Sequence, residues 1–115
     1  MSGKGAATQA AAGEDRNEVI LVGRVSGGPA VKEMPSGDSL VTLRLVVGRA
    51  KGDPVDTIDL ACWSASARRS AERLGDGDRA EVHGALRRRF FRTATGAASR
   101  YEVEVMRLRR VARAT

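Results

Sequence analysis

Apolar and polar residues alternate in several short runs of this chain, and clusters of Gly, Pro, Ser and Asp separate the runs. A period of two places successive side chains on opposite faces of a β-strand. The alternation predicts five strands, over residues 18–25, 39–49, 55–63, 79–91 and 100–111. Turns are predicted at 26–29, 34–38, 50–54 and 76–78, and a hairpin loop centred on Gly96 is predicted at 92–99.

One segment breaks this alternation. Residues 64–74 contain no β-branched residue and are rich in Ala and Arg, which predicts a helix that Gly75 ends. The element order is therefore three strands, one helix and two strands. That order is typical of the OB-fold, a five-stranded Greek-key barrel with one helix between the third and fourth strands, and it places the chain in the mostly all-β class.

The alternation also predicts the direction of individual side chains. On the strand 79–91, the expected inward positions are Ala80, Val82, Gly84 and Leu86. On the strand 100–111, one face carries Tyr101, Val103 and Val105, and the apolar positions then change face to Met106 and Leu108. This change of face predicts a bulge or a second buried face. The remaining positions of that strand, Glu102 and Glu104, are expected on a solvated face.

The length of 115 residues suits a single domain, which is expected over residues 17–111. Residues 1–16 combine Ala, Gly and polar residues without the apolar region of a signal peptide, so a disordered arm is expected there. Residues 112–115 are expected to form a short basic end. Because no apolar run approaches the roughly 20 residues of a membrane helix, no membrane association is expected.

Few residues are candidates for catalysis or metal binding. The single cysteine, Cys62, excludes an internal disulfide, suits a reducing cytoplasm and is expected in the core as a small side chain. His83 is the only histidine, whereas a zinc site needs a cluster of His and Cys ligands. No glycine-rich phosphate-binding motif is present. The sequence therefore predicts neither an enzyme nor a bound cofactor or metal.

The net positive charge is confined to the last thirty residues. Residues 86–115 contain nine Arg and two Glu, whereas the first 85 residues carry a net charge of −1. The basic segment also holds Phe90, Phe91 and Tyr101, three of the four aromatic residues. Arginine beside aromatic rings is typical of surfaces that bind phosphates and stack unpaired bases. The alternative is a solvated cationic surface.

Candidate binding residues lie on two strands. Arg87, Arg89 and Phe91 are two apart, so their side chains leave from one face, whereas Arg88 and Phe90 leave from the other. Trp63 ends the third predicted strand on its polar face, with Thr57, Asp59 and Ala61. An outward tryptophan indicates a contact with a ligand, although it could instead close the end of the barrel or contact a partner subunit.

Five motifs carry a resemblance to a known family. They are NEVILVGRV at 17–25, PAVKEMPSG at 29–37, LACW at 60–63, VHGAL at 82–86 and the basic run at 87–91. In this order they resemble bacterial single-stranded DNA-binding proteins of the homotetrameric OB-fold type, over residues 17–111. The resemblance implies base stacking on Trp63 and Phe91, backbone contacts from Arg87 and Arg89, a basic contact from Lys32, and a dimer surface at residues 19–23.

The sequence also departs from the family pattern. Lys51 and Thr57 stand where relatives often place aromatic residues, and Asp59 stands where a basic residue is common. The chain has no acidic C-terminal tip, so recruitment of partner enzymes through such a tip is not expected. The expected nucleic-acid-binding residues are Trp63, Phe91, Arg87, Arg89, Lys32, Lys51, Arg49, Thr57 and Arg92.

The predicted function is sequence-independent binding and protection of single-stranded DNA in replication, repair or recombination. The resemblance implies a homo-oligomer, most simply a tetramer, in the cytoplasm at the nucleoid. Two alternatives remain open. The barrel could be a protein-interaction subunit with weakened DNA binding, or it could bind single-stranded RNA, because a base presents the same stacking face on either sugar.

Overall fold

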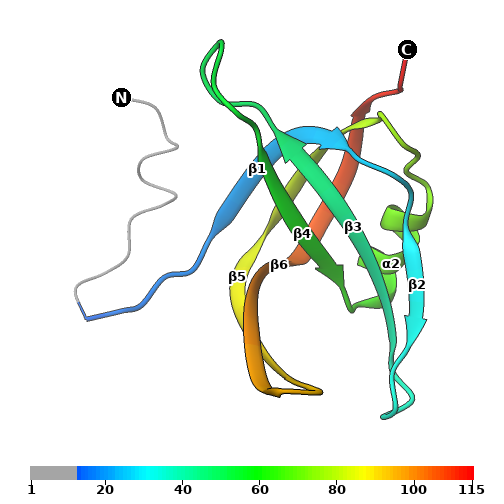
Figure 1. Cartoon of the computed structure of the whole chain (residues 1–115). Coiled ribbons are helices and arrows are strands. Elements are labelled where there is room, and N and C mark those ends of the chain that lie inside the picture. Colours follow the sequence, from blue (N-terminus) through cyan, green and yellow to red (C-terminus); the bar gives the residue numbers. More distant parts are fainter. Residues whose placement is uncertain (1–12) are drawn as a thin grey trace.

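The computed structural model describes residues 13–115, so most of the arm expected at 1–16 lies outside the described residues. Within residues 13–115, six strands and one helix follow in chain order (Figure 1). They are β1 (Val19–Val25), β2 (Ala30–Glu33), β3 (Ser39–Val47), β4 (Asp56–Cys62), α2 (Ala65–Glu72), β5 (Arg79–Thr93) and β6 (Gly96–Ala112).

The strand pairings form a closed circuit. β1 pairs with β5, β5 with β6, β6 with β4, β4 with β3, and β3 pairs back to β1 through Arg24–Val46 and Val25–Leu45. All these pairs are antiparallel except β4 with β6. With α2 between β4 and β5, this arrangement is the OB-fold that the element order predicts.

The short strand β2 is not among the strands that the alternation predicts. Its four residues are all exposed, and it pairs only with β3. A strand that buries neither face carries no alternating apolar positions, so its sequence gives no periodic signal.

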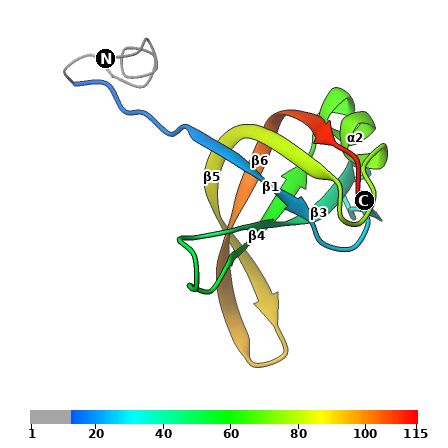
Figure 2. The same cartoon turned by 90° about the horizontal axis from the view of Figure 1, so that it is seen from above.

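The predicted hairpin loop at 92–99 is wrong. β5 continues to Thr93 and β6 begins at Gly96, so the turn between them consists of two residues. Thr93 pairs with Gly96, and the two strands project beyond the barrel as a long hairpin (Figure 2). Small and polar residues fill this part of the hairpin because it faces no core, and their composition therefore resembles that of a loop.

The predicted bulge is present on β6. His83 pairs with Arg107 and Gly84 pairs with Val105, which leaves Met106 without a partner on β5. The bulge keeps Val105 and Leu108 in the core although they are three residues apart. Gly84 lies at this close crossing, because a Cβ there would stand 2.1 Å from the carbonyl oxygen of Glu104.

The prediction that Leu86 is an inward, buried residue is wrong. Leu86 is 46% exposed, whereas its cross-strand partner Val103 is buried. The ladder between β1 and β5 ends at Val19 and Gly84, and the side chain of Asn17 bonds to the backbone of Leu86 in place of a further β1 residue. Leu86 therefore lies on the part of β5 with which no residue of β1 pairs.

The core is aliphatic, as the composition indicates. It contains Leu43, Leu45, Leu60, Val82 and Val103, and α2 adds Ala67 and Ala71 against one end. Cys62 is buried among these residues, which confirms its expected place, and burial raises the pKa of its thiol to about 12. No helix within residues 13–115 is long and apolar enough to cross a membrane.

The C-terminal end returns to the start of β5. The backbone N–H of Ala114 donates to Asp78 Oδ1 at 2.8 Å, and Arg110 lies 3.4 Å from the other carboxylate oxygen. The backbone N–H of Gly75 also donates to Asp78, at 2.9 Å. These donors lower the pKa of Asp78, with the hydrogen bonds from Gly75 and Ala114 as the largest causes.

Candidate nucleic-acid interface

Trp63 is held at the junction between β4 and α2. It directly follows Cys62, the last residue of β4, and Ser64 caps the helix by accepting a hydrogen bond from the N–H of Ala67 at 3.2 Å. The guanidinium of Arg68 donates to the carbonyl of Trp63, which fixes the backbone on the helix side. The indole is half-buried, and the alternation along β4 places it on the side opposite the core residues Leu60 and Cys62.

The β5–β6 hairpin brings its arginines to the same side. Arg87 pairs with Glu102 and Arg89 with Arg100, and paired residues of antiparallel strands point to one face. The guanidinium carbon of Arg89 lies 5.8 Å from the centre of the Trp63 ring, and that of Arg100 lies 5.9 Å from the centre of the Phe91 ring. We call this surface the Trp63 face, formed by Trp63, Arg87, Arg89, Phe91, Arg100, Glu102 and Glu104.

Each arginine of the Trp63 face has a carboxylate neighbour. Arg87 donates to Glu104 at 2.8 Å, and Glu102 lies 3.7 Å from Arg89 and 3.8 Å from Arg100. Glu102 is only 4% exposed, so the expectation that it lies on a solvated face is wrong. A carboxylate can be buried here because two guanidinium groups flank it and compensate its lost hydration.

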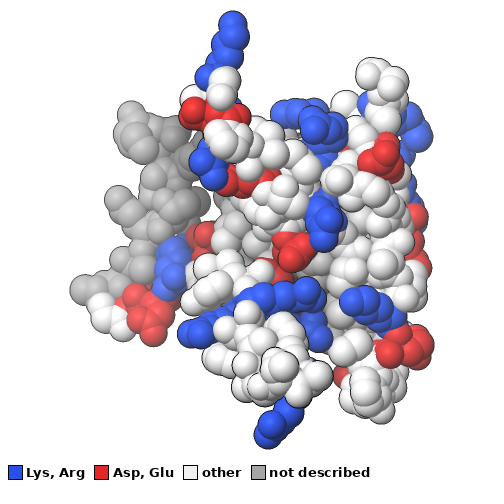
Figure 3. All heavy atoms as spheres, in the orientation of Figure 1, with Lys and Arg blue, Asp and Glu red and all other residues white. Residues whose placement is uncertain are grey.

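A polar groove of about 260 Å³ adjoins this face. Lys32 from β2, Arg44 from β3 and Asp59 from β4 line it, together with Arg100 and Glu102. Arg44 lies 3.7 Å from Asp59, so a neighbouring strand offsets the acidic charge that departs from the family pattern. Figure 3 shows the side where β3 and β4 lie in front, with acidic side chains between the basic ones rather than one continuous basic stripe.

Three of the expected residues lie toward the other end of β4. Thr57 precedes Trp63 by six residues, which corresponds to about 20 Å along an extended strand. Arg49 and Lys51 follow the end of β3, and both are exposed. Arg49 donates to Asp56 at 2.7 Å, and this hydrogen bond and charge raise the pKa of the guanidinium. The structure therefore does not bring these three residues together with Trp63.

Arg92 is also separated from the Trp63 face. It pairs with Ala97 and alternates with Phe91, so its side chain leaves from the opposite face of the hairpin.

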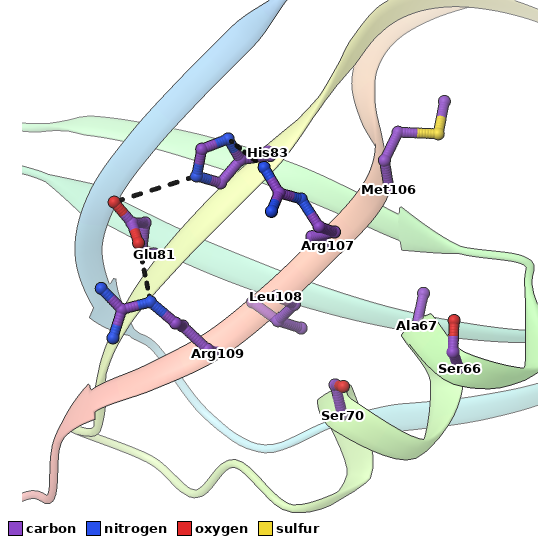
Figure 4. Close-up of a pocket in the computed structure, with 9 residues that line it drawn as sticks. All are labelled: Ser66, Ala67, Ser70, Glu81, His83, Met106, Arg107, Leu108 and Arg109. Carbon is purple, nitrogen blue, oxygen red and sulfur yellow. Dashed lines mark hydrogen bonds and ion pairs between the residues drawn. The ribbon is translucent and has the colours of Figure 1, made fainter.

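A second hollow, of about 330 Å³, lies between α2 and the outward sides of β5 and β6 (Figure 4). Glu81 accepts a hydrogen bond from Arg109 at 2.8 Å and lies 3.9 Å from His83. Arg107 also lines this hollow and has no carboxylate within 4 Å among residues 13–115, so only one of its two arginines is paired. No group of three or more possible metal ligands occurs among residues 13–115.

Sequence reasoning missed Arg100, Glu102 and Glu104 as parts of the site. Their position depends on the hairpin register, which places Arg100 opposite Arg89 only because the turn has two residues. A two-residue turn predicted at 94–95 would have set this register and placed the carboxylates opposite the arginines. The eight-residue loop that was predicted instead left the facing residues undefined.

Comparisons with known proteins agree with this architecture. The model of the single-strand binding protein family matches residues 16–111. A single-stranded DNA-binding protein of Thermosynechococcus vestitus is 36% identical over 72 residues, which span 62% of this chain and 60% of that protein. The chain thus matches less than two thirds of that relative's length.

A solved structure shows the same fold. The structure described as Plasmodium falciparum SSB in complex with single-stranded DNA has a TM-score of 0.71 at 20% identity, over 85% of this chain and 96% of that one. The family match extends from before β1 to the penultimate residue of β6 and includes both strands of the hairpin. On that match, the chain belongs to the single-strand binding protein family.

Proposed function

We propose that this chain binds single-stranded DNA without sequence preference, on the Trp63 face. The observation that carries the proposal is the pairing of two outward rings, Trp63 and Phe91, with a guanidinium over each. Bases stack on exposed rings while arginines contact phosphates, and neither contact reads the sequence of bases. The family match and the structure of a relative with single-stranded DNA support the same ligand.

The chain's own residues divide this work. Trp63 and Phe91 each offer a ring to an unstacked base, and the adjacent Arg89 and Arg100 add a cation–π contribution. Lys32 and Arg44 line the neighbouring groove, which gives the phosphate backbone a continuation away from the hairpin. Duplex DNA is excluded because its bases are already stacked and their faces are not available. No step of this function requires catalysis.

Replacement of Trp63 tests the proposal. A stacked base is worth about 1–3 kcal/mol, so Trp63→Ala should weaken binding of labelled poly-dT by roughly one to two orders of magnitude. Trp63→Phe is the matched control, because it keeps a ring in the same position and should retain most of the affinity. The binding is measured by fluorescence anisotropy of the labelled DNA. Equal affinity of the native protein for single-stranded and duplex DNA would reject the proposal.

Protein recognition is the second candidate function. The carboxylates beside Arg87, Arg89 and Arg100 reduce the net charge of the face, and Lys51 and Thr57 offer no ring. Titration of the native Trp63 fluorescence with poly-dT, poly-U and duplex DNA separates the possibilities. Quenching by poly-U equal to that by poly-dT would indicate RNA as well as DNA, and no quenching by any of them would favour a protein ligand.

The chain is further proposed to act as a homo-oligomer, most simply a tetramer. Ile20 and Val22 alternate with the inward residues of β1, yet Ile20 is 52% exposed and Val22 is also open to solvent. Apolar side chains on both faces of a strand favour a partner that covers the outer one. A mass of 12.2 kDa by light scattering at micromolar concentration would identify a monomer and contradict this proposal.

The cellular setting follows from the proposed ligand. Single-stranded DNA arises in replication, repair and recombination, so we place the chain in the cytoplasm at the nucleoid. The domain is proposed to extend over residues 17–111, with the arm at 1–16 before it and the short basic end at 112–115 after it.

A further inference from the structure

The two faces of the β5–β6 hairpin differ in their electrostatics. On the Trp63 face, every arginine has a carboxylate neighbour within 4 Å. The opposite face, which we call the distal hairpin face, is formed by Leu86, Arg88, Phe90, Arg92 and Tyr101. Within residues 13–115, neither Arg88 nor Arg92 takes part in an ion pair. This face therefore presents uncompensated positive charge.

The same face carries the two most exposed rings of the hairpin. Phe90 is 69% exposed and Tyr101 is 59% exposed. The guanidinium carbon of Arg88 lies 4.9 Å from the centre of the Phe90 ring and 5.7 Å from that of Tyr101. Arg88 Nε also donates to Ser99 Oγ at 3.2 Å, which holds the guanidinium between the rings. Arginine and rings are thus arranged on this face before any ligand arrives.

We propose that the distal hairpin face is a second binding surface for single-stranded nucleic acid. A base stacks on Phe90 or Tyr101, and Arg88 and Arg92 contact the adjoining phosphates. This inference rests on the proposed function, because the strand that occupies the Trp63 face continues onto the distal hairpin face. The hairpin is only two strands wide, with about 5 Å between strands, so a few nucleotides suffice to pass around its edge.

Charge argues for a nucleic acid rather than a second copy of the chain on this face. A two-fold contact places the same patch of both copies together, so Arg88 and Arg92 of each copy would meet with no described carboxylate between them. Like charges in contact disfavour association, whereas a polyanion neutralises both arginines. By comparison, the exposed residues Ile20 and Val22 on β1 pair with His83 and Glu81, and the charge of Glu81 is compensated by a hydrogen bond from Arg109.

The test compares two variants of one hairpin. In Phe90→Ala/Tyr101→Ala the distal rings are removed, and in Phe91→Ala a ring of the Trp63 face is removed. Trp63 reports binding of poly-dT and of an oligothymidylate of about five nucleotides, near the lower limit of site sizes for one OB-fold. The distal variant should bind poly-dT about tenfold more weakly, cover fewer nucleotides per chain at saturation, and bind the short oligomer within twofold of the native protein. Phe91→Ala should weaken both.

The outcomes separate this inference from the proposed function. If the native protein does not prefer single-stranded DNA, the proposed function fails. If Phe91→Ala weakens binding but the distal variant keeps native affinity and site size, the distal surface alone is rejected. A lower oligomeric mass of the distal variant in light scattering, with unchanged binding of poly-dT, would instead identify a protein–protein contact and would also overturn the inference.

Cross-linking provides a direct readout that does not depend on folding of a variant. Poly-dT substituted with 5-iodouracil forms adducts with nearby aromatic side chains under ultraviolet light. Adducts mapped by mass spectrometry should include Phe90 or Tyr101 in addition to Trp63 or Phe91. Adducts confined to Trp63 and Phe91 at saturating poly-dT would contradict a second surface.

Discussion

Glu104→Gln tests whether the ion pairs of the Trp63 face weaken its attraction for phosphate. Glu104 accepts from Arg87 at 2.8 Å, and its side chain remains partly exposed. A phosphate bound to the far side of that guanidinium would lie about 6 Å from the carboxylate. Repulsion between unit charges at this distance is about 0.7 kcal/mol in water and about 2.8 kcal/mol at an effective dielectric constant of 20.

Screening at physiological ionic strength, with a Debye length of about 8 Å, roughly halves these values. Removal of the carboxylate charge should therefore tighten binding of single-stranded DNA about two- to tenfold. The cost to folding should stay below about 1 kcal/mol, because the pair is partly exposed.

The assay is fluorescence anisotropy of labelled oligothymidylate at about 0.15 M salt, repeated at higher salt, where the gain should shrink. Glu72→Gln on α2 is the matched control, since Glu72 is exposed and the substitution changes the net charge equally. Equal gains in both variants would reduce the effect to net charge alone. Weaker binding of Glu104→Gln would show that the carboxylate positions Arg87 productively, and would refute a repulsion between Glu104 and the bound phosphate.

Three further predictions concern the fold. Gly84→Ala should destabilise the protein by about 1–3 kcal/mol or more in urea unfolding, because its Cβ would overlap the carbonyl oxygen of Glu104; a neutral effect would contradict the close crossing. Cys62 should resist thiol reagents at pH 8 until denaturant is added. Because the pKa of its thiol is raised to about 12 in the folded state, the free energy of unfolding should fall as the pH rises above about 8.5, the pKa of the unfolded thiol. Cys62→Ala should remove this pH dependence. Because the folded pKa of Asp78 is lowered, its contribution should be present at neutral pH and lost as the pH falls below about 4; Asp78→Asn should flatten this acid dependence of the unfolding free energy and release Ala114.

The sequence predicted those parts of the fold in which side chains face a core. The alternation located β1, β3 and β4, and the change of face near Met106 indicated the bulge on β6. It failed where strands have no core to face, in β2 and in the outer half of the hairpin. Periodicity reports burial, so a strand that is exposed on both sides gives no signal.

For the candidate site, the sequence predicts which side chains of one strand share a face. It does not predict which residues of the neighbouring strand lie opposite them. The spacing of Arg87, Arg89 and Phe91 correctly places them on one face. The carboxylates that neutralise these arginines come from β6, and their position depends on a register that a two-residue turn sets. Sequence reasoning therefore located the basic charge and could not determine how much of it is free.

The distinction between basic charge and free charge changes the expected salt dependence. Five of the nine arginines in residues 86–115 have a carboxylate within 4 Å, namely Arg87, Arg89, Arg100, Arg109 and Arg110. The other four are Arg88, Arg92, Arg107 and Arg113. A single strand contributes about −0.7 to the log–log slope of affinity against salt for each phosphate neutralised.

Nine free arginines would therefore contribute a slope of about −6 per chain, whereas the four unpaired ones contribute about −3. Two of these four, Arg88 and Arg92, belong to the distal hairpin face. Their joint replacement by Ala should flatten the slope by about 1.4, more than replacement of the paired Arg87 and Arg89. A measured slope near −6, reduced mainly by loss of Arg87 and Arg89, would mean that DNA breaks the ion pairs of the Trp63 face as it binds.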